Sequence, residues 1–382
     1  MTRRATRGWR TVALIAFAVL LTACGGGMAR QQRAELDAAY ADAERAFSLG
    51  DSARAEAGFV ALEALGTPDA LGLGAYRRAQ LRLRANDLRG AAQLFERARS
   101  VGTPDRAALA ELRLARLDIE ALSQEARGRE RLRALVEAWP STGAADRAVK
   151  YLALKRTPAT ERDRGHDWET ARWLAEVSQR TTGETVSDNA AFWSAWVRLH
   201  RVGDIGGARD ALRAFVSAYG GVSALADDAF WLLGAIERRQ GRFDAAIATY
   251  EAFLALRQTA GSLLGPFRSK RLDDVAYLVG AVHFHDRGDL DAAARAFERL
   301  LAEFSSSTWR DDALWALAGV AHLRGDKGGT HAALKRLVSE HADSRFAALA
   351  RAALDGQGPT LARSPGSINT GLLDPREPGA AL

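Results

Sequence analysis

The chain has 382 residues, and its 53 basic and 47 acidic residues give a net charge of +6. Four of the positive charges lie in the first ten residues, so the rest of the chain is nearly neutral, and no basic stripe with interleaved aromatic residues occurs. This charge pattern argues against a nucleic-acid-binding protein, and a single cysteine excludes an internal disulfide.

The amino-terminal residues 1–23 have the pattern of an export signal. Four arginines precede an apolar run over residues 12–23. That run is shorter than the roughly 20 residues that a membrane-spanning helix needs. We therefore expect residues 1–23 to be a signal peptide.

The signal ends in Leu21-Thr22-Ala23-Cys24, which resembles the lipobox of bacterial lipoproteins. The resemblance implies cleavage before Cys24 and lipid on its thiol and new amino terminus. Cys24 is the one cysteine of the chain, and an exported protein otherwise avoids a free thiol. Gly25 follows instead of the Asp of an inner-membrane retention signal, so we expect attachment to the periplasmic face of the outer membrane. A short helix with a buried cysteine is the alternative.

Three further segments differ in composition. Residues 24–33 begin with the lipidated cysteine and three glycines, which predicts a flexible tether. Residues 34–355 are rich in Ala, Leu, Arg and Glu and show no strand pattern, which predicts helices. Residues 356–382 hold four of the nine prolines and few aromatic residues, which predicts a disordered tail.

The clearest helical pair lies in residues 227–256. Apolar stripes at helical spacing lie on both sides of Gly241, which can adopt the left-handed conformation that ends a helix. Gly234 and Ala246 are small enough for two antiparallel helices to cross closely. Six positions have a spacing that resembles the tetratricopeptide repeat, namely Phe230, Leu233, Gly234, Gly241, Ala246 and Tyr250. The resemblance implies a right-handed superhelix of helical hairpins.

The turn of this unit recurs along the chain. Each of six turns starts with Gly or Asn, and in five of them an Asp that can cap the second helix follows. The six turns start at Gly50, Asn86, Gly203, Gly241, Gly288 and Gly325. The interval of 117 residues between the second and third turns is three times 39, which predicts two degenerate units there. We therefore predict an all-α solenoid of about eight hairpins.

Two stretches interrupt the repeat. Residues 141–185 keep it poorly, and we expect an irregular unit there that divides the solenoid into two halves. Residues 257–269 contain Gly261, Gly265 and Pro266 and lengthen one interval to 47 residues. We expect this insertion to form a protruding loop.

The sequence contains no catalytic or cofactor-binding motif of the G-x-S-x-G, P-loop or H-E-x-x-H type. His283 and His285 are two residues apart on a predicted helix, so their side chains face different directions and are poorly placed for a metal. Three Asp pairs open predicted helices, where capping and compensation of the helix dipole explain them. The pairs are Asp227-Asp228, Asp273-Asp274 and Asp311-Asp312. We predict a non-enzymatic protein with no cofactor and no metal.

The resemblance to the tetratricopeptide repeat also predicts a binding groove. In such units, the residue after the first aromatic position and the residue seven later lie on the concave side. The first of these positions forms an apolar column of Trp193, Trp231, Leu278 and Trp315. The second forms a polar column of His200, Arg238, His285 and His322. Tryptophan beside Arg or His is typical of binding hot spots. In the alternative interpretation the frame is shifted by one residue, and the tryptophans pack between hairpins.

Two classes of function follow. A lipid-anchored solenoid resembles the tetratricopeptide lipoproteins of outer-membrane barrel assembly, of the Tol-Pal system, and of pilus or gliding machineries. That resemblance implies a non-enzymatic adaptor that binds segments of envelope proteins. The helical superhelix of soluble lytic transglycosylases is also similar, which implies an accessory part of a peptidoglycan-processing system. Those enzymes carry a catalytic domain after the superhelix, whereas only the predicted tail follows here.

Overall fold

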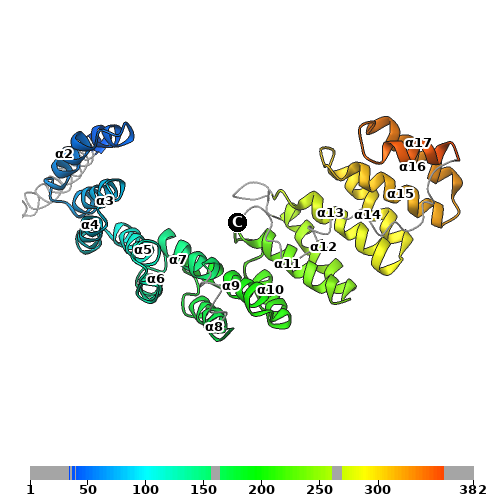
Figure 1. Ribbon diagram of the computed structural model, residues 1–382. Coiled ribbons are helices and arrows are strands. Elements are labelled where there is room, and N and C mark those ends of the chain that lie inside the picture. Colours follow the sequence, from blue (N-terminus) through cyan, green and yellow to red (C-terminus); the bar gives the residue numbers. More distant parts are fainter. Residues whose placement is uncertain (1–33, 35–36, 39, 156–163, 260–268, 357–382) are drawn as a thin grey trace, which may run out of the picture. The chain divides into compact units, whose positions relative to one another are not determined.

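The computed structural model describes residue 34 and residues 37–38, 40–155, 164–259 and 269–356. Helices dominate these ranges, and no strand occurs in them (Figure 1). The predicted all-α solenoid is therefore confirmed. Cys24 and the predicted signal peptide, tether and tail lie outside the described residues, apart from the first residue of the tail.

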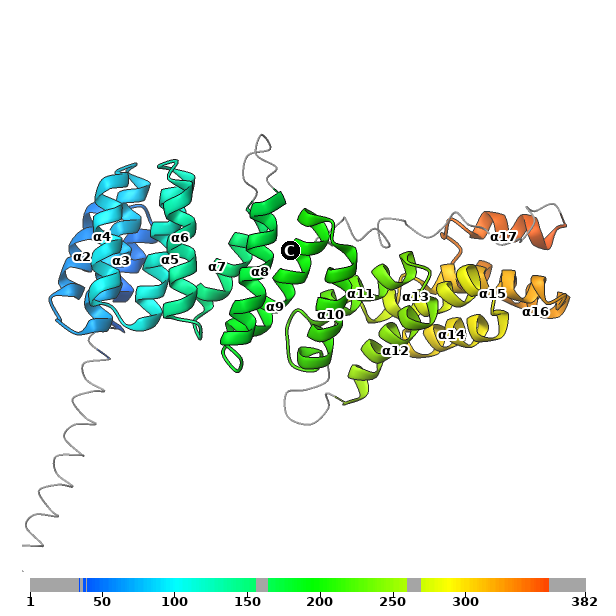
Figure 2. The same ribbon diagram turned by 90° about the horizontal axis from the view of Figure 1, so that it is seen from below.

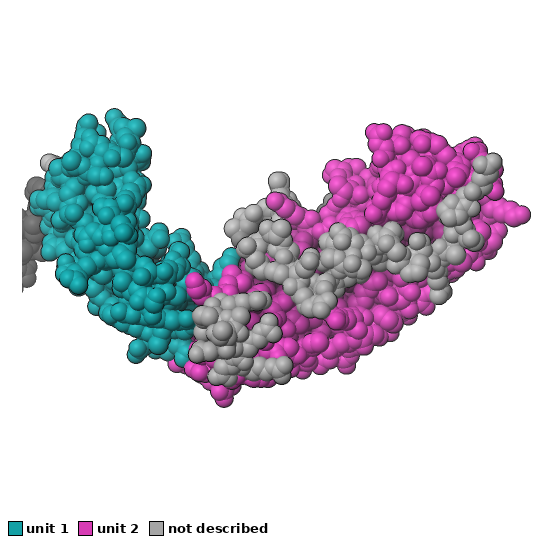
Figure 3. All heavy atoms as spheres, viewed as in Figure 1, with its two compact units in different colours: residues 1–152, 183–186 teal, residues 153–182, 187–382 magenta. Residues whose placement is uncertain are grey.

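The chain forms two compact units (Figure 3). Unit 1 consists of Met1–Leu152 and Gly183–Val186, and unit 2 consists of Ala153–Thr182 and Ser187–Leu382. The boundaries between the units lie between residues 152 and 187, close to residues 141–185, where the repeat is poorly kept in the sequence.

Unit 1 stacks helices that are neighbours in the sequence. After helical residues 40–48 come α2 (Ser52–Glu63), α3 (Pro68–Arg84), α4 (Leu88–Val101), α5 (Pro104–Glu120), α6 (Glu125–Ala138) and most of α7 (Gly143–Leu154). From α2 to α6, each helix contacts the next, and α3 also contacts α5 (Figure 2). Contacts limited to near neighbours in this way define a solenoid.

Unit 2 continues the same pattern. Its helices are α8 (Arg164–Arg180), α9 (Val186–Val197), α10 (Ile205–Tyr219), α11 (Ala226–Arg239), α12 (Phe243–Thr259), α13 (Leu272–Ala281), α14 (Leu290–Glu303), α15 (Arg310–Leu323), α16 (Lys327–Glu340) and α17 (Ala347–Leu354). Two π-helical turns, η1 (Arg198–Val202) and η2 (Val282–Arg287), extend α9 and α13. The loop predicted over residues 257–269 starts later than expected, because α12 runs to Thr259, and residues 260–268 lie outside the described ranges.

All six predicted turns have the expected backbone. Their Gly or Asn residues have φ between +58° and +80°, the left-handed region that glycine and asparagine tolerate best. The five Asp residues that follow cap the second helix, each accepting a backbone N–H at 2.8 to 3.1 Å. Local turn chemistry therefore ends the first helix of each pair and starts the second.

A seventh turn lies between α5 and α6 and was not predicted by position. Ser123 has φ +54° there, 37 residues after Asn86, and no side chain caps α6. This turn belongs to the first of the two degenerate units expected in the long interval. The second is represented by α7 and α8, whose connection over residues 156–163 lies outside the described ranges.

Small residues set the close packing inside each hairpin. Ala246 is fully buried, as are the alanines at the equivalent positions of four other units. A Cβ atom on Gly234 would lie 2.2 Å from the ring of Tyr250, and one on Gly280 would lie 2.5 Å from the ring of Phe297. At these two crossings glycine leaves room for the aromatic ring of the second helix, whereas Ala43 and Ala79 hold the equivalent position in the first two hairpins.

The Asp pairs have a role that the sequence did not predict. They lie in the first turns of α11, α13 and α15, where their negative charge compensates the positive end of the helix dipole. No side chain caps these helices. Several of these residues instead accept hydrogen bonds from the segment that starts the next hairpin. Arg271 donates to Asp228 at 2.6 Å, and Arg345 donates to Asp312 at 2.6 Å. The pairs thus join successive repeats rather than cap their own helices.

Candidate partner-binding face

The predicted groove residues all lie on the first helices of the unit 2 hairpins, on α9 with η1, α11, α13 with η2, and α15. Trp193 is 1% exposed and packs edge-on against Phe192 and Trp196, with ring centroids 5.2 and 5.7 Å apart. Leu278 is 2% exposed. Both are core residues, so the expectation that they line an accessible groove does not agree with the structure.

The other two members of the apolar column differ from each other. Trp231 is 7% exposed, and the guanidinium of Arg271 lies 5.0 Å from the centroid of its ring. Trp315 is only partly buried and stacks on Phe346, which immediately precedes α17, at a centroid distance of 5.3 Å. Of the apolar column, Trp315 therefore retains the most surface for a partner.

The polar column is more accessible than the apolar one. His200 is partly buried and its ring lies 4.6 Å from that of Trp196, while His285 contacts Phe284. His322 is exposed at the end of α15. Arg238, by contrast, forms an ion pair with a residue of the next repeat that is described below.

The two π-helical turns explain why the columns do not keep one register. Asp289 N–H donates to the carbonyl of His283, six residues earlier, whereas Asp326 N–H donates to the carbonyl of Ala321, five residues earlier. Asp204 shows the six-residue pattern as well. The helices that end in η1 and η2 thus contain one additional residue before their turn.

This additional residue offsets positions counted back from the turn. Gly234 lies seven residues before Gly241, whereas Gly280 lies eight residues before Gly288, yet both contact the aromatic ring nine residues after the turn. Trp193 and Leu278 were assigned without this offset. With the offset, Phe192 and Tyr277 correspond to Trp231, and all three are buried, so the offset changes the register but is not the cause of the burial.

One contact within the face escaped the sequence prediction. The Nε of Arg238 on α11 donates to Asp286 on η2 at 2.5 Å, and both side chains are largely buried. The pair links two successive first helices across 48 residues of sequence. The sequence gives little indication of this ion pair, because Asp286 lies in the π-helical turn η2, which was not predicted.

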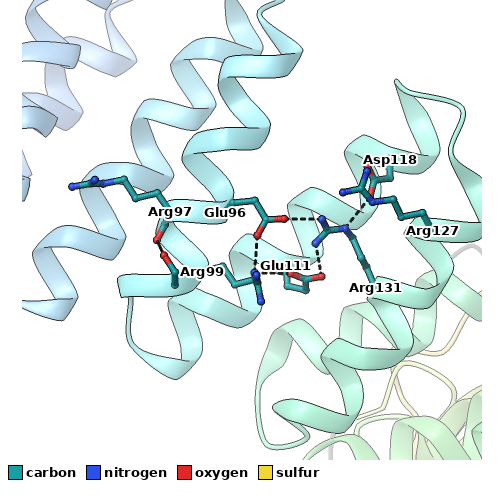
Figure 4. Close-up of polar contacts among 8 residues, drawn as sticks. Glu96, Arg97, Arg99, Glu111, Asp118, Arg127 and Arg131 are labelled. Carbon is teal, nitrogen blue, oxygen red and sulfur yellow. Dashed lines mark hydrogen bonds and ion pairs between the residues drawn. The ribbon is translucent and has the colours of Figure 1, made fainter.

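Unit 1 carries a network of ion pairs rather than free carboxylates. Figure 4 shows Arg131 of α6 between the carboxylates of Glu96, Glu111 and Asp118, at 2.7, 2.8 and 2.9 Å. Burial opposes the charge of Arg131, but its bonds to Glu111 and Glu96 outweigh burial and raise its pKa above the ordinary value. These carboxylates join α4, α5 and α6 and are not arranged as a general acid and base.

A pocket of about 300 Å³ lies at the end of unit 2. His322 from α15 and the first two turns of α16 line it, and Ala353 and Leu354 at the end of α17 close one side. Leu334 forms part of its apolar lining and is 2% exposed. The pocket therefore combines an apolar floor with a polar rim, and His322 of the predicted polar column belongs to it.

Metal-binding clusters and membrane-spanning helices are both absent from the described ranges. Within them, no group of three or more His, Cys, Asp or Glu residues is placed to hold a metal ion. Among the helices of the same residues, none has both the length and the apolar composition for crossing a bilayer.

Residues 228–257 match the tetratricopeptide repeat family. The match lies within the α11–α12 hairpin, which therefore resembles a tetratricopeptide repeat. Its Gly241 turn, buried Ala246 and Gly234–Tyr250 contact recur in neighbouring hairpins, so these share the tetratricopeptide pattern. A search of curated proteins finds no significant match to the chain.

Several solved structures are similar at low identity. The pilF protein of Pseudomonas aeruginosa is 15% identical, with a TM-score of 0.35, over 63% of this chain and 95% of that one. A tetratricopeptide protein of Cytophaga hutchinsonii is 13% identical, with a TM-score of 0.38, over 81% and 97%. PilW, a type IV pilus biogenesis factor, is 13% identical, with a TM-score of 0.27, over 72% and 95%. At these values, the likenesses carry no argument about function.

Proposed function

We propose that this protein is a non-enzymatic, lipid-anchored scaffold on the periplasmic face of the outer membrane. It binds segments of envelope proteins and supports the assembly of an envelope complex. The observation that carries the proposal is the tetratricopeptide hairpin of residues 228–257 within a solenoid of similar hairpins. Solenoids of this kind present extended surfaces on rigid helices, which suits the binding of other chains.

The anchoring part of the proposal rests on the sequence. The basic start, the apolar run of 12 residues and the Leu21-Thr22-Ala23-Cys24 junction support export and lipidation. Several acyl chains, each contributing about 0.8 kcal/mol per buried CH₂, make such attachment effectively permanent. A scaffold fixed in this way meets its partners at the membrane surface.

The partner-binding part concerns the face of unit 2. Trp315 and His322 are its accessible members, and the Arg238–Asp286 ion pair links α11 to η2 among the first helices of the same unit. Trp193, Trp231 and Leu278 hold these helices in place. We propose that a partner segment binds along this face through Trp315, His322 and His285.

The anchor is tested by replacing Cys24 with Ser in the full chain expressed in a bacterial host. We expect unprocessed precursor and loss of the protein from the outer-membrane fraction, and mass spectrometry of the wild type should find an acylated amino-terminal Cys24. Normal membrane fractionation of the variant would contradict lipid anchoring.

The scaffold role is tested separately by crosslinking in intact cells and affinity recovery of the mature protein. Specific envelope proteins should be recovered with the wild type. Trp315→Ala should weaken that recovery, while Leu49→Ala, which changes an exposed side chain in unit 1, should not. Recovery of no envelope protein by the wild type would contradict a scaffold role.

A further inference from the structure

The second helix of the α11–α12 hairpin carries a buried hydroxyl where the other repeat units have a purely apolar side chain. Tyr250 lies nine residues after the turn at Gly241. The equivalent residues of the other five units with a predicted turn are Phe59, Phe95, Leu212, Phe297 and Leu334. All six side chains are at most 2% exposed. Phe or Leu therefore meets the packing requirement of this position, and the hydroxyl of Tyr250 adds a polar group to the core.

The Tyr250 hydroxyl is buried and has no hydrogen-bond partner among the described residues. Burial raises the pKa of Tyr250, so the hydroxyl keeps its proton at neutral pH and can donate a hydrogen bond. A buried hydroxyl without a hydrogen bond destabilises the folded state. Phenylalanine would avoid that loss, as Phe297 does at the same position of the α13–α14 hairpin.

A second buried donor without a partner belongs to the same cluster of polar groups. The charged groups that act on the hydroxyl are Arg238, Glu237 and Asp286. Glu237 is satisfied, because it accepts hydrogen bonds from Arg213 at 2.6 Å and from Thr249 at 2.7 Å. Arg238 donates to Asp286 through Nε, whereas its Nη1 is buried and has no partner in the part of the chain that the structure describes. The cluster thus contains two donors that lack an acceptor.

Charge and space limit what can bind these two donors. The ion pairs Arg238–Asp286 and Arg213–Glu237 already balance each other, so a further buried ion would be left without a counter-charge. A methyl group added to α11 opposite the aromatic ring would lie 2.2 Å from that ring, so the packing there is close. A single water molecule is neutral and small, and buried waters typically form about three hydrogen bonds to polar groups that lack other partners.

We propose that the Tyr250 hydroxyl and Arg238 Nη1 bind one buried water molecule, which joins α12 to α11 beside the Arg238–Asp286 ion pair. The water accepts a hydrogen bond from each of the two donors, and its own hydrogens are available to the carboxylate of Asp286. Because Asp286 belongs to η2, the water helps to hold Arg238 between its own hairpin and the next one. The inference is independent of the proposed function, since it concerns the joint between two repeats.

Tyr250→Phe tests the site, because it removes the hydroxyl and keeps the ring. We expect a lower midpoint of urea unfolding for the mature protein, since the water loses one of its partners. A midpoint equal to or above that of the wild type would overturn the proposal, because it would mean that the hydroxyl has no hydrogen bond to lose. Phe297→Tyr is the matched control, since it makes the reverse change at the equivalent buried position. If it raised the midpoint by as much as Tyr250→Phe lowers it, tyrosine would stabilise this position generally, and the site would be refuted.

A double-mutant cycle with Arg238→Met tests whether the two groups share one ligand. The double variant should lose less stability than the sum of the two single variants, because either change alone breaks the bridge. Additive losses would overturn the proposal.

A crystal structure of the mature protein then identifies the ligand. It should show one water oxygen within hydrogen-bonding distance of both the Tyr250 hydroxyl and Arg238 Nη1. A direct hydrogen bond between the two side chains, or an ion in place of the water, would overturn the proposal.

Discussion

Replacing Gly234 with Ala tests the packing between the two helices of the tetratricopeptide hairpin. The added Cβ would lie 2.2, 2.5 and 2.8 Å from three atoms of the Tyr250 ring. Tyr250 is fully buried, so its ring cannot move into solvent. Overpacking of this kind costs about 1 to 3 kcal/mol, against which alanine gains about 1 kcal/mol of helix propensity. We expect a net loss of up to about 2 kcal/mol in the free energy of unfolding relative to the wild type.

Urea unfolding followed by tryptophan fluorescence measures this loss. Gly206→Ala is the matched control, because the nearest atom to its added Cβ is 4.0 Å away and only the gain in helix propensity remains. Contacts in a solenoid are local, so hydrogen exchange should increase in α11 and α12 and stay unchanged in α3. An unfolding midpoint of Gly234→Ala equal to or above that of Gly206→Ala would refute the close crossing.

Two further predictions concern unit 2. Trp193→Ala should lower the free energy of unfolding by about 3 to 5 kcal/mol, because Trp193 is fully buried. Trp315→Ala should lower it by clearly less, because Trp315 is only partly buried. Equal losses of the two variants in urea unfolding would contradict this prediction. Burial raises the pKa of Asp312 to about 6, from an ordinary value of 3.8. The folded state therefore binds more protons between these values, and the free energy of unfolding should fall by about 2 kcal/mol as pH rises from 4 to 7. Asp312→Asn should remove this slope, and an unchanged slope would show that other groups cause it.

The repeat architecture could be predicted because its turns depend on local chemistry. A helix that ends in the left-handed region favours Gly or Asn, and a following Asp caps the next helix, so Gly50-Asp51 or Gly325-Asp326 can be recognised within the sequence. Ser123 adopts the same conformation without either signal. Because serine rarely adopts a positive φ, the turn between α5 and α6 was predictable from the repeat length but not from its residues.

The contacts between repeats were not predictable, since they depend on how hairpins stack. Asp228 and Asp312 have the spacing of capping residues, and only the stacked structure places Arg271 and Arg345 against them. The pocket has the same origin. Lys327 and His331 are ordinary surface residues in the sequence, and the packing of α17 on α16 brings them into one pocket with Ala353 and Leu354.

The register of the predicted groove failed for a reason that the sequence does contain. Taking the residue after the first aromatic position treats the first helices as equal, but η1 and η2 each contain one additional residue. The distance from the small crossing residue to the turn glycine reveals this, since it is seven residues from Gly234 to Gly241 and eight from Gly280 to Gly288. The inserted residue leaves the core contact in place and alters only the last turn, where Asp286 then reaches Arg238. The two π-helical turns therefore change the polar surface at one end of the first helices while the packing beneath it is kept, as expected where a binding face differs between repeats of one solenoid.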